Sequence, residues 1–268
     1  MSIITLTTDF GLADGYVGTM KGVILSIHPT ATIVDISHDI APQDVREAAY
    51  TLYAAYPYFP QGTIHVVVVD PGVGSERRAI ALRTSQAIFV APDNGVLSYV
   101  VAGERVEQIV HLTNPSYHLS PVSRTFHGRD IFAPAAAHLA RGIPLAELGQ
   151  PLTEIITFSL PRPQIHPDGT IVGEVIHIDR FGNLITSITA TDLAGHSPLR
   201  ESVVKIKGQS IRGIVNTYAE VTPGKPLALI GSEDHLEISV SGGSASQTLA
   251  ARVGDEVLLK VKGHERRR

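Results

Sequence analysis

The chain has 268 residues, of which 43% are hydrophobic and 18% are charged, with a formal net charge of −4 at pH 7 and no cysteine. This composition is sufficient for a sizeable core, excludes global disorder, and lacks the broad positive charge that attracts nucleic acid or anionic membranes. Without cysteine, the protein cannot form a disulfide, a thiolate nucleophile or a cysteine-ligated metal site.

Strand-like and helix-like segments alternate in the first half of the chain. Residues 1–9 lack the basic and apolar regions of a signal peptide, and no apolar run is long enough to cross a bilayer, so we expect a cytoplasmic protein. Runs of β-favouring residues predict strands at 3–7, 32–36, 64–69, 79–82 and 87–90. Apolar periodicity and terminal residues predict helices at 16–27, 45–56 and 131–140.

The strand predicted at 64–69 and the helix predicted at 131–140 show how they are placed in the fold. The nearly continuous β-branched run at 64–69 is typical of a strand that is covered on both faces, as in a parallel sheet. The helix at 131–140 has Asp130 available as its N-cap and Gly142 just past its end.

The alternating pattern predicts a Rossmann-like open α/β domain over residues 1–158. In sheets of this kind, ligands bind outside the carboxyl ends of the strands. Asp70 follows one predicted strand directly and Asp9 follows another after one residue, so this edge of the sheet is where we expect a site.

The character of the sequence changes after the first domain. Residues 159–169 are rich in proline and predict a linker. Beyond it, short β-like runs separated by turn residues predict a smaller all-β barrel domain over residues 170–264, with a sandwich as the alternative. These runs lie at 172–178, 184–189, 203–206, 211–215, 227–230, 236–240 and 257–261.

Asp70 is the first candidate for chemistry. A carboxylate that ends a buried apolar strand must be solvated or paired, and Arg77, across a glycine-rich loop, is a plausible partner. These residues alone fit a structural ion pair and a catalytic group equally well. The loop has Gly72 and Gly74 but no complete glycine fingerprint, which disfavours a dinucleotide-dependent oxidoreductase.

His127 is the second candidate, because it stands just before a predicted helix. The positive end of the helix dipole favours the neutral imidazole, which can accept a proton or orient a water near pH 7. Taken alone, His127 is better explained as an exposed loop histidine with no function. In the second domain, residues 179–183 and 231–240 contain acidic, aromatic and amide side chains that could hold a ligand. Taken alone, residues 179–183 are more simply interpreted as an ordinary β-turn, and residues 231–240 are ambiguous in the same way.

Read together, these segments resemble the S-adenosyl-L-methionine (SAM) hydrolase family, also described as SAM hydroxide adenosyltransferases and related to fluorinating and chlorinating enzymes. The resembling motifs, in chain order, are TDFG (8–11) with Asp14 and KG (21–22), VDPGVG (69–74), APDNG (91–95), FHGRD (126–130), DRFGN (179–183) and LEI (236–238). None of these motifs is specific by itself, whereas the ordered set is.

The resemblance implies an enzyme that converts SAM and water to adenosine and L-methionine without a metal or another cofactor. It also implies a homotrimer that holds SAM between the first domain of one subunit and the barrel of the next. The family's water-handling triad maps onto Asp70, Arg77 and His127, with Arg78 as the adjacent alternative to Arg77.

The same resemblance assigns substrate contacts. Asp9 is expected at the ribose hydroxyls; Asp14, Asp179 and Ser232 at the methionine end; and Phe181 and Asn183 at the adenine. Further expected substrate contacts are Phe126, Glu237 and Val240.

Departures from the halogenating relatives indicate which nucleophile is used. Those enzymes carry a tyrosine where Asp70 stands, different residues where His127 and Gly128 stand, and a longer insertion. A carboxylate beside the attack position would repel a halide, so we expect water, with Asp70 and His127 accepting its hydrogen bonds and Arg77 fixing Asp70. The alternatives are a 5′-halogenating SAM enzyme and a SAM- or adenosine-binding module without catalysis.

Overall fold

The computed structural model describes residues 2–194 and 199–261. The chain forms two compact units, Met1–Leu160 and Pro161–Arg268. The division between them falls inside the segment for which the sequence predicts a linker. In the described residues, no helix is both long and apolar enough to cross a membrane.

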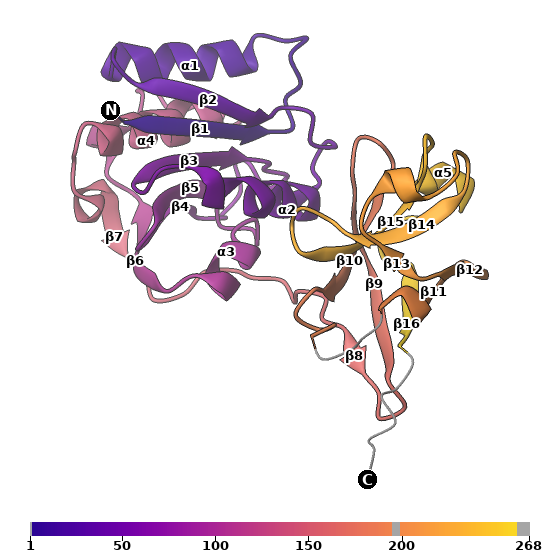
Figure 1. Cartoon of the computed structure of the whole chain (residues 1–268). Coiled ribbons are helices and arrows are strands. Elements are labelled where there is room, and N and C mark those ends of the chain that lie inside the picture. The colour runs from indigo at the N-terminus through magenta and orange to yellow at the C-terminus, as the bar shows by residue number, and fades with distance from the viewer. Residues whose placement is uncertain (1, 195–198, 262–268) are drawn as a thin grey trace. The chain divides into compact units, whose positions relative to one another are not determined.

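The first unit is built on a seven-stranded sheet (Figure 1). Its strands, in sheet order, are β2 (Thr32–Ser37), β1 (Ile3–Thr8), β3 (Thr63–Val68), β5 (Ala87–Pro92), β4 (Ala79–Thr84), β6 (Val106–Leu112) and β7 (Gly149–Pro151). The first four strands run parallel to one another, and each later pair is antiparallel. The sheet is therefore mixed, with its parallel part at the β2 side.

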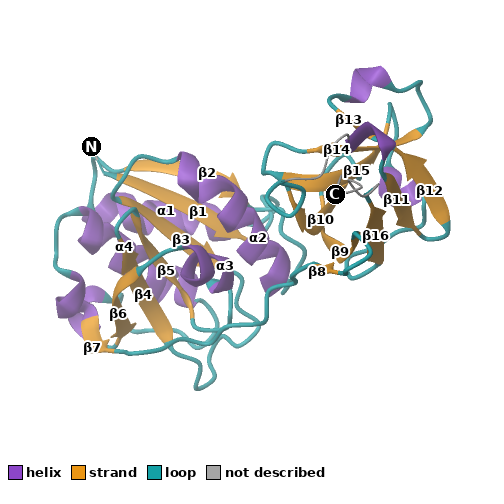
Figure 2. Ribbon diagram, turned by 60° about the horizontal axis from the view of Figure 1, so that its bottom comes forward, coloured by secondary structure: helices purple, strands orange, loops and turns teal. Residues whose placement is uncertain are grey.

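Helices cover both faces of this sheet (Figure 2). The helices are α1 (Tyr16–Ile27), α2 (Val45–Ala55), α3 (Ser98–Gly103) and α4 (Ala133–Ala140). α1 and α4 pack on one face through residues such as Met20, while α2 and α3 pack on the other through residues such as Leu52. Alternate residues of β3 enter the two cores, with Val66 on the α1 side and Val67 on the α2 side.

The structure confirms the main sequence-based expectation for this unit. All six residues of β3 are buried, and the strand is parallel to both of its neighbours. The prediction that Asp130 caps the helix was wrong. Gly128–Phe132 already form a π-helical turn ahead of α4, so Asp130 lies inside helical backbone and its carboxylate accepts the Ser123 N–H at 2.8 Å instead.

The second unit contains a nine-stranded sheet. Its strands are β8 (Gln164–Ile165), β9 (Thr170–Ile178), β10 (Leu184–Thr189), β11 (Val203–Ile206), β12 (Gln209–Arg212), β13 (Ile214–Val215), β14 (Pro226–Ile230), β15 (His235–Val240) and β16 (Glu256–Lys260). All pairs are antiparallel except β13 with β14, and the sheet curls so that β12 comes close to β14. A short helix, α5 (Ala245–Thr248), packs against β15. The expectation of a mixed α/β protein with two sheets is confirmed.

Gly74 marks a close approach between two loops of the first unit. Its φ is +77°, a conformation that L side chains rarely adopt, and a Cβ there would collide with the backbone carbonyl oxygen of Arg124. The loop after β3 is thereby held against the segment that precedes Gly128–Phe132.

We expect Gly74→Ala to destabilise the protein more than Gly62→Ala. Both glycines have positive φ, so alanine costs about 1–2 kcal/mol at either position, but nothing lies within 4 Å of a Cβ at Gly62. At Gly74 the Arg124 backbone must also move, which adds at least about 1 kcal/mol. Urea unfolding of the two variants measures the difference, and equal losses of stability would contradict the close approach.

Candidate active site

Asp9 and Asp70 lie at the same edge of the first sheet. β1 and β3 are parallel neighbours, and their ladder ends with Thr8 opposite Val68. Because Asp9 follows β1 and Asp70 follows β3 after one more residue, both carboxylates stand just beyond the carboxyl ends of adjacent strands, as the sequence predicts.

A cavity of about 350 Å³ opens at this edge. It is lined by Asp9, Phe10, Tyr16, Pro42, Gln43, Val68, Asp70, Pro71, Val73, Thr125, Phe126, His127 and Gly128. Four predicted site residues therefore meet there: Asp9, Asp70, Phe126 and His127. Its volume is at the lower end of the range for small-molecule sites.

Three aromatic rings form one wall of the cavity. The ring of Phe126 meets those of Phe10 and Tyr16 edge-on, with centroids 5.8 and 5.2 Å apart. Phe10 and Tyr16 are 5.7 Å apart. Edge-to-face contacts of this kind favour a particular mutual orientation of the rings. Sequence reasoning included Phe126 but not the other two rings, because a tertiary contact brings them together.

The Asp70 carboxylate is paired with the Arg77 guanidinium. Arg77 Nε donates to Asp70 Oδ1 at 2.9 Å and to Oδ2 at 3.0 Å, and Nη2 also donates to Oδ2. The two side chains are only 6% and 9% exposed. The guanidinium carbon lies 5.3 Å from the centre of the Phe132 ring, which adds a cation–π contact. Asp70 is thus a buried charge with a fork-shaped partner.

Arg78, the adjacent arginine, points elsewhere. Its Nε donates to Asp93 Oδ2 at 2.7 Å and its Nη2 to the Glu154 carbonyl at 3.3 Å. Of the two arginines that the sequence offers, Arg77 is therefore the one beside Asp70.

His127 completes a chain of three contacts. Arg77 Nη2 lies 2.7 Å from His127 Nδ1. A guanidinium can only donate, so Nδ1 is the acceptor and the neutral ring carries its proton on Nε2. Burial and the neighbouring Arg77 charge lower the pKa of His127 below 6.5, against the opposing effects of Asp70, the Ser123 backbone and Asp130. The neutral form expected from the sequence therefore has a cause in burial and Arg77.

Asp9 is held by the backbone of a strained residue. Its Oδ2 accepts the Gln43 N–H at 2.8 Å, and Gln43 has a φ of +68°. Non-glycine residues in this conformation concentrate at functional sites. Asp14 is exposed in the loop between β1 and α1 and does not line the cavity.

The predicted ligand residues of the second unit form a tight turn. Asp179 Oδ1 accepts the N–H groups of Phe181 at 2.9 Å and Asn183 at 2.8 Å, while Asp179 Oδ2 accepts Asn183 Nδ2 at 2.8 Å. Asp179 and Asn183 thus have the turn role that was the simpler interpretation of the sequence. The turn presents the Phe181 ring, which is 77% exposed, to solvent.

Glu237 is a buried carboxylate in the second unit. It accepts Tyr218 Oη at 2.7 Å and Ser239 Oγ at 2.6 Å. Burial, the bond to Glu237 and the nearby Asp179 raise the pKa of Tyr218. Tyr218 is 44% exposed, and nothing in the local sequence predicts its bond to Glu237. Ser232 is exposed in the turn before β15, and Val240 is buried at the end of that strand.

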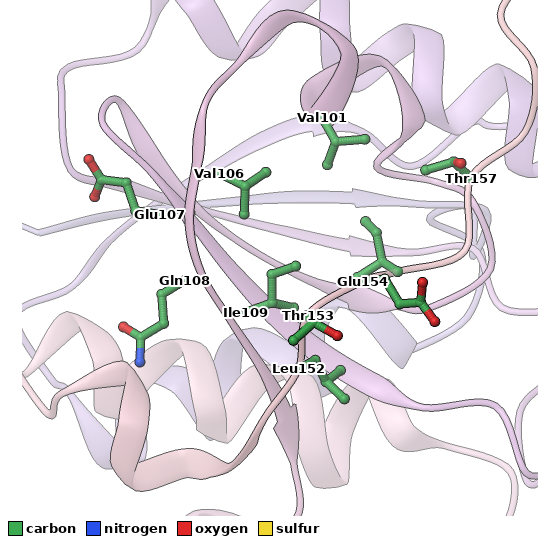
Figure 3. A pocket seen from close by; sticks show the side chains of 10 residues that line it. Val101, Val106, Glu107, Gln108, Ile109, Leu152, Thr153, Glu154 and Thr157 are labelled. Carbon is green, nitrogen blue, oxygen red and sulfur yellow. The ribbon is translucent and has the colours of Figure 1, made fainter.

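A second hollow of about 380 Å³ lies beside β6 (Figure 3). It is bounded by the first half of β6 and by residues 152–157, and it shares no residue with the cavity at Asp70. None of the predicted site residues lines it. Within residues 2–194 and 199–261, no cluster of three histidine, aspartate or glutamate side chains could hold a metal ion.

Comparisons with known proteins match the chain over nearly its full length. A protein named (R)-S-adenosyl-L-methionine hydrolase from Salinispora tropica is 40% identical over 95% of this chain and 96% of its own. A protein of the same name from Methanocaldococcus jannaschii is 37% identical over 96% and 95% of the two chains. A fluorinase from Nocardia brasiliensis is 29% identical over 97% of each.

A solved structure of an uncharacterised conserved protein from Thermotoga maritima has the same fold, with a TM-score of 0.90 and 38% identity over 97% of this chain and all of that one. The family model described as the SAM hydroxide adenosyltransferase N-terminal domain matches residues 4–149, and the model of the corresponding C-terminal domain matches residues 173–258. The chain belongs to the SAM hydroxide adenosyltransferase family.

Proposed function

We propose that this protein hydrolyses SAM to adenosine and L-methionine. The observation that carries the proposal is the contiguous set of Asp70, Arg77 and His127 beside a cavity at the carboxyl ends of β1 and β3. The family and the names of its relatives supply the substrate, and the chemistry of the three side chains supports water as the nucleophile.

The leaving group of this reaction does not need a general acid. The C5′–S bond of SAM breaks with its electron pair returning to a sulfonium, so methionine leaves as a neutral thioether and needs no proton. The new C5′–O bond is formed by a water that must lose a proton, and unassisted water has a pKa of about 15.7. Holding this water in line with the C5′–S bond supplies up to about 7–11 kcal/mol.

Within the triad, we assign proton acceptance to Asp70. The Nδ1 lone pair of His127 already accepts from Arg77, and Nε2 of the neutral ring carries a proton, so His127 has no free acceptor for the water. We therefore propose that Asp70 alone accepts a hydrogen bond from the water, in place of the expectation from the sequence that Asp70 and His127 both do so. His127 then acts on Arg77, keeping the guanidinium directed at Asp70, and the water's proton moves to the Asp70 carboxylate.

The halogenating alternative is disfavoured by charge. A halide placed where the water must stand would face the Asp70 carboxylate, and the positive charge of Arg77 is already paired with that carboxylate. The fluorinase relatives are 29–34% identical to this chain, below the 37–40% of the hydrolase relatives. If the protein only bound SAM or adenosine, the buried triad would have no chemical function.

Several finer features are part of the same proposal. The relatives are named for the R epimer of SAM, and we propose the same preference here. We further propose a cytoplasmic homotrimer, to be tested by light scattering, in which Asp14, Asp179, Phe181, Asn183, Ser232, Glu237 and Val240 contribute to substrate binding. From the family we also propose that the reaction needs no metal or cofactor. We propose in the same way that the first unit is Rossmann-like and that the second is barrel-like.

The first expected outcome concerns the wild-type protein. In the presence of EDTA, (R)-SAM should be converted to equal amounts of adenosine and methionine, and (S)-SAM should react more slowly, as followed by chromatography. Adding fluoride or chloride should give no 5′-halo-5′-deoxyadenosine. No products would favour the binding module, a halogenated product would favour a halogenase, and activity restored by a specific metal would overturn metal independence.

Asp70→Asn should lower kcat by about 10²–10⁴-fold, because it removes the proton acceptor but keeps the shape of the side chain. SAM binding, measured by calorimetry, should persist. Glu107→Gln is the control, since it makes the same change at a carboxylate in the hollow beside β6. Near-normal turnover by Asp70→Asn would remove Asp70 from the mechanism.

His127 variants separate an orienting role from a basic one. His127→Asn keeps an amide oxygen that can accept from Arg77, so it should retain most of kcat, whereas His127→Leu leaves a buried donor unpaired and should lose about 10–100-fold. If His127 were the base, both variants would be equally inactive.

The pH profile gives a second readout for His127. Because the pKa of His127 is lowered, the wild-type ring should stay neutral until the pH falls below 6.5. Down to that pH, kcat/KM should stay constant. Protonation at lower pH places an Nδ1–H against Arg77, so activity should fall. In His127→Asn this acid limb should move to lower pH.

A further inference from the structure

Asp70 and Arg77 both lie beyond the hydrogen-bonded part of the sheet. The β3–β5 ladder ends at the Val66–Val90 pair and the β1–β3 ladder at Thr8–Val68, so Val69 and Asp70 have no strand partner. β4 begins only after Arg77. Regular backbone pairing therefore does not fix either member of the ion pair.

The side chain of Asn94 replaces the missing strand partner of Val69. Asn94 follows β5, and its Nδ2 donates to the carbonyl of Val69 at 2.9 Å, while its Oδ1 accepts the Val96 N–H at 3.2 Å. Val69 is fully buried, so its carbonyl requires a donor. This bond fixes the peptide that leads directly into Asp70.

Asp93 fixes the residue that follows Arg77. Its Oδ2 accepts Arg78 Nε at 2.7 Å and pairs with Arg78 Nη2, and its own N–H donates to the Arg78 carbonyl at 2.9 Å. Its Oδ1 accepts the Ile156 N–H at 2.7 Å. The Asp93 side chain is 1% exposed, so both of its carboxylate oxygens are engaged inside the protein. Arg78 is thereby held away from Asp70, and Arg77 is the arginine left facing it.

We propose that Asp93 and Asn94 are positioning residues for the reaction: Asn94 sets the backbone before Asp70, and Asp93 sets the backbone after Arg77. The inference rests on the proposed function, because it names what holds the proposed proton acceptor and its partner in register. Neither residue lines the cavity, so both act through the triad rather than on substrate.

The magnitude follows from geometry. A displacement of about 1 Å in a group that must align a nucleophile can reduce turnover about 10²-fold. Loss of the Asn94 bond should therefore lower kcat and leave SAM affinity nearly unchanged, since Asp9 and the aromatic wall are untouched. A residue that served stability alone would lower the unfolding midpoint without this selective loss.

The test is Asn94→Asp, with Asn114→Asp as a matched control. Asn94→Asp keeps the acceptor for Val96 and loses the donor to Val69. Asn114 makes the same pair of bonds elsewhere, with Nδ2 donating to the Glu147 carbonyl at 2.7 Å and Oδ1 accepting the Ser116 N–H at 3.1 Å. At neutral pH, Asn94→Asp should lose about 10²-fold in kcat, while the dissociation constant for SAM changes less than about threefold. Asn114→Asp should lose stability only.

The pH gives a further signature of the lost donor. At low pH, the carboxyl group introduced by Asn94→Asp becomes protonated and regains a hydrogen that can point at the Val69 carbonyl. The kcat of this variant relative to wild type should therefore rise as the pH falls. Equal kcat for the Asn94 and Asn114 variants at neutral pH would overturn the assignment of Asn94. If the wild type itself fails to hydrolyse SAM, the proposed function fails instead, so the two failures are distinguishable.

Arg78→Lys tests the Asp93 half independently, and it also tests the proposal if the Asn94 variant does not fold. Lysine keeps the positive charge but lacks the planar guanidinium that pairs with the Asp93 carboxylate. We expect kcat to fall about tenfold or more with SAM affinity retained. An unchanged kcat in a folded Arg78→Lys protein would show that Asp93 does not position Arg77.

Discussion

The first unit is organised around a buried charge that needs a fixed partner. An uncompensated carboxylate at the position of Asp70 would be very unfavourable, so Arg77 must lie beside it, and breaking such a pair typically costs about 3–5 kcal/mol. Gly72 leaves room for this arginine, because a Cβ there would stand 3.2 Å from Arg77 Cγ. Gly74 brings in the segment that leads to His127. The glycines of the VDPGVG motif thus serve the ion pair, and phosphate binding is not needed to explain them.

Once this pair is fixed, the state of His127 follows. Arg77 has donors left after binding Asp70, and one of them occupies Nδ1. A guanidinium donates hydrogen bonds and cannot accept one, so it favours the neutral histidine whose Nδ1 lone pair faces it. Burial acts in the same direction, because it disfavours the charged ring. With His127 in this state, the proposed mechanism has the Asp70 carboxylate as the base that takes the water's proton.

Sequence reasoning predicted those features that depend on local pattern. The apolar run of β3 specified a strand buried on both faces, and its end placed Asp70 at the correct edge. β6 was missed because its first half, which includes Glu107 and Gln108, is more exposed and so lacks a continuous apolar run. Asp130 was misplaced because a π-helical turn cannot be distinguished from a cap by residue type. The choice of Arg77 over Arg78 depends on Asp93, which is 15 residues away from Arg78, so no local rule could make it.

The charges at the cavity also suit a cationic substrate. Asp70 and Arg77 offset each other, so the triad presents no net positive charge to a sulfonium, and Asp9 adds a carboxylate at the cavity wall. In the proposed mechanism Asp70 becomes neutral when it takes the water's proton, and the fixed Arg77 guanidinium then offsets the negative charge on the attacking oxygen without reorganising. In this mechanism Arg77 must stay in place while the water loses its proton, and we propose that the ion pair one residue further along the chain, between Arg78 and the buried Asp93 side chain, meets that requirement.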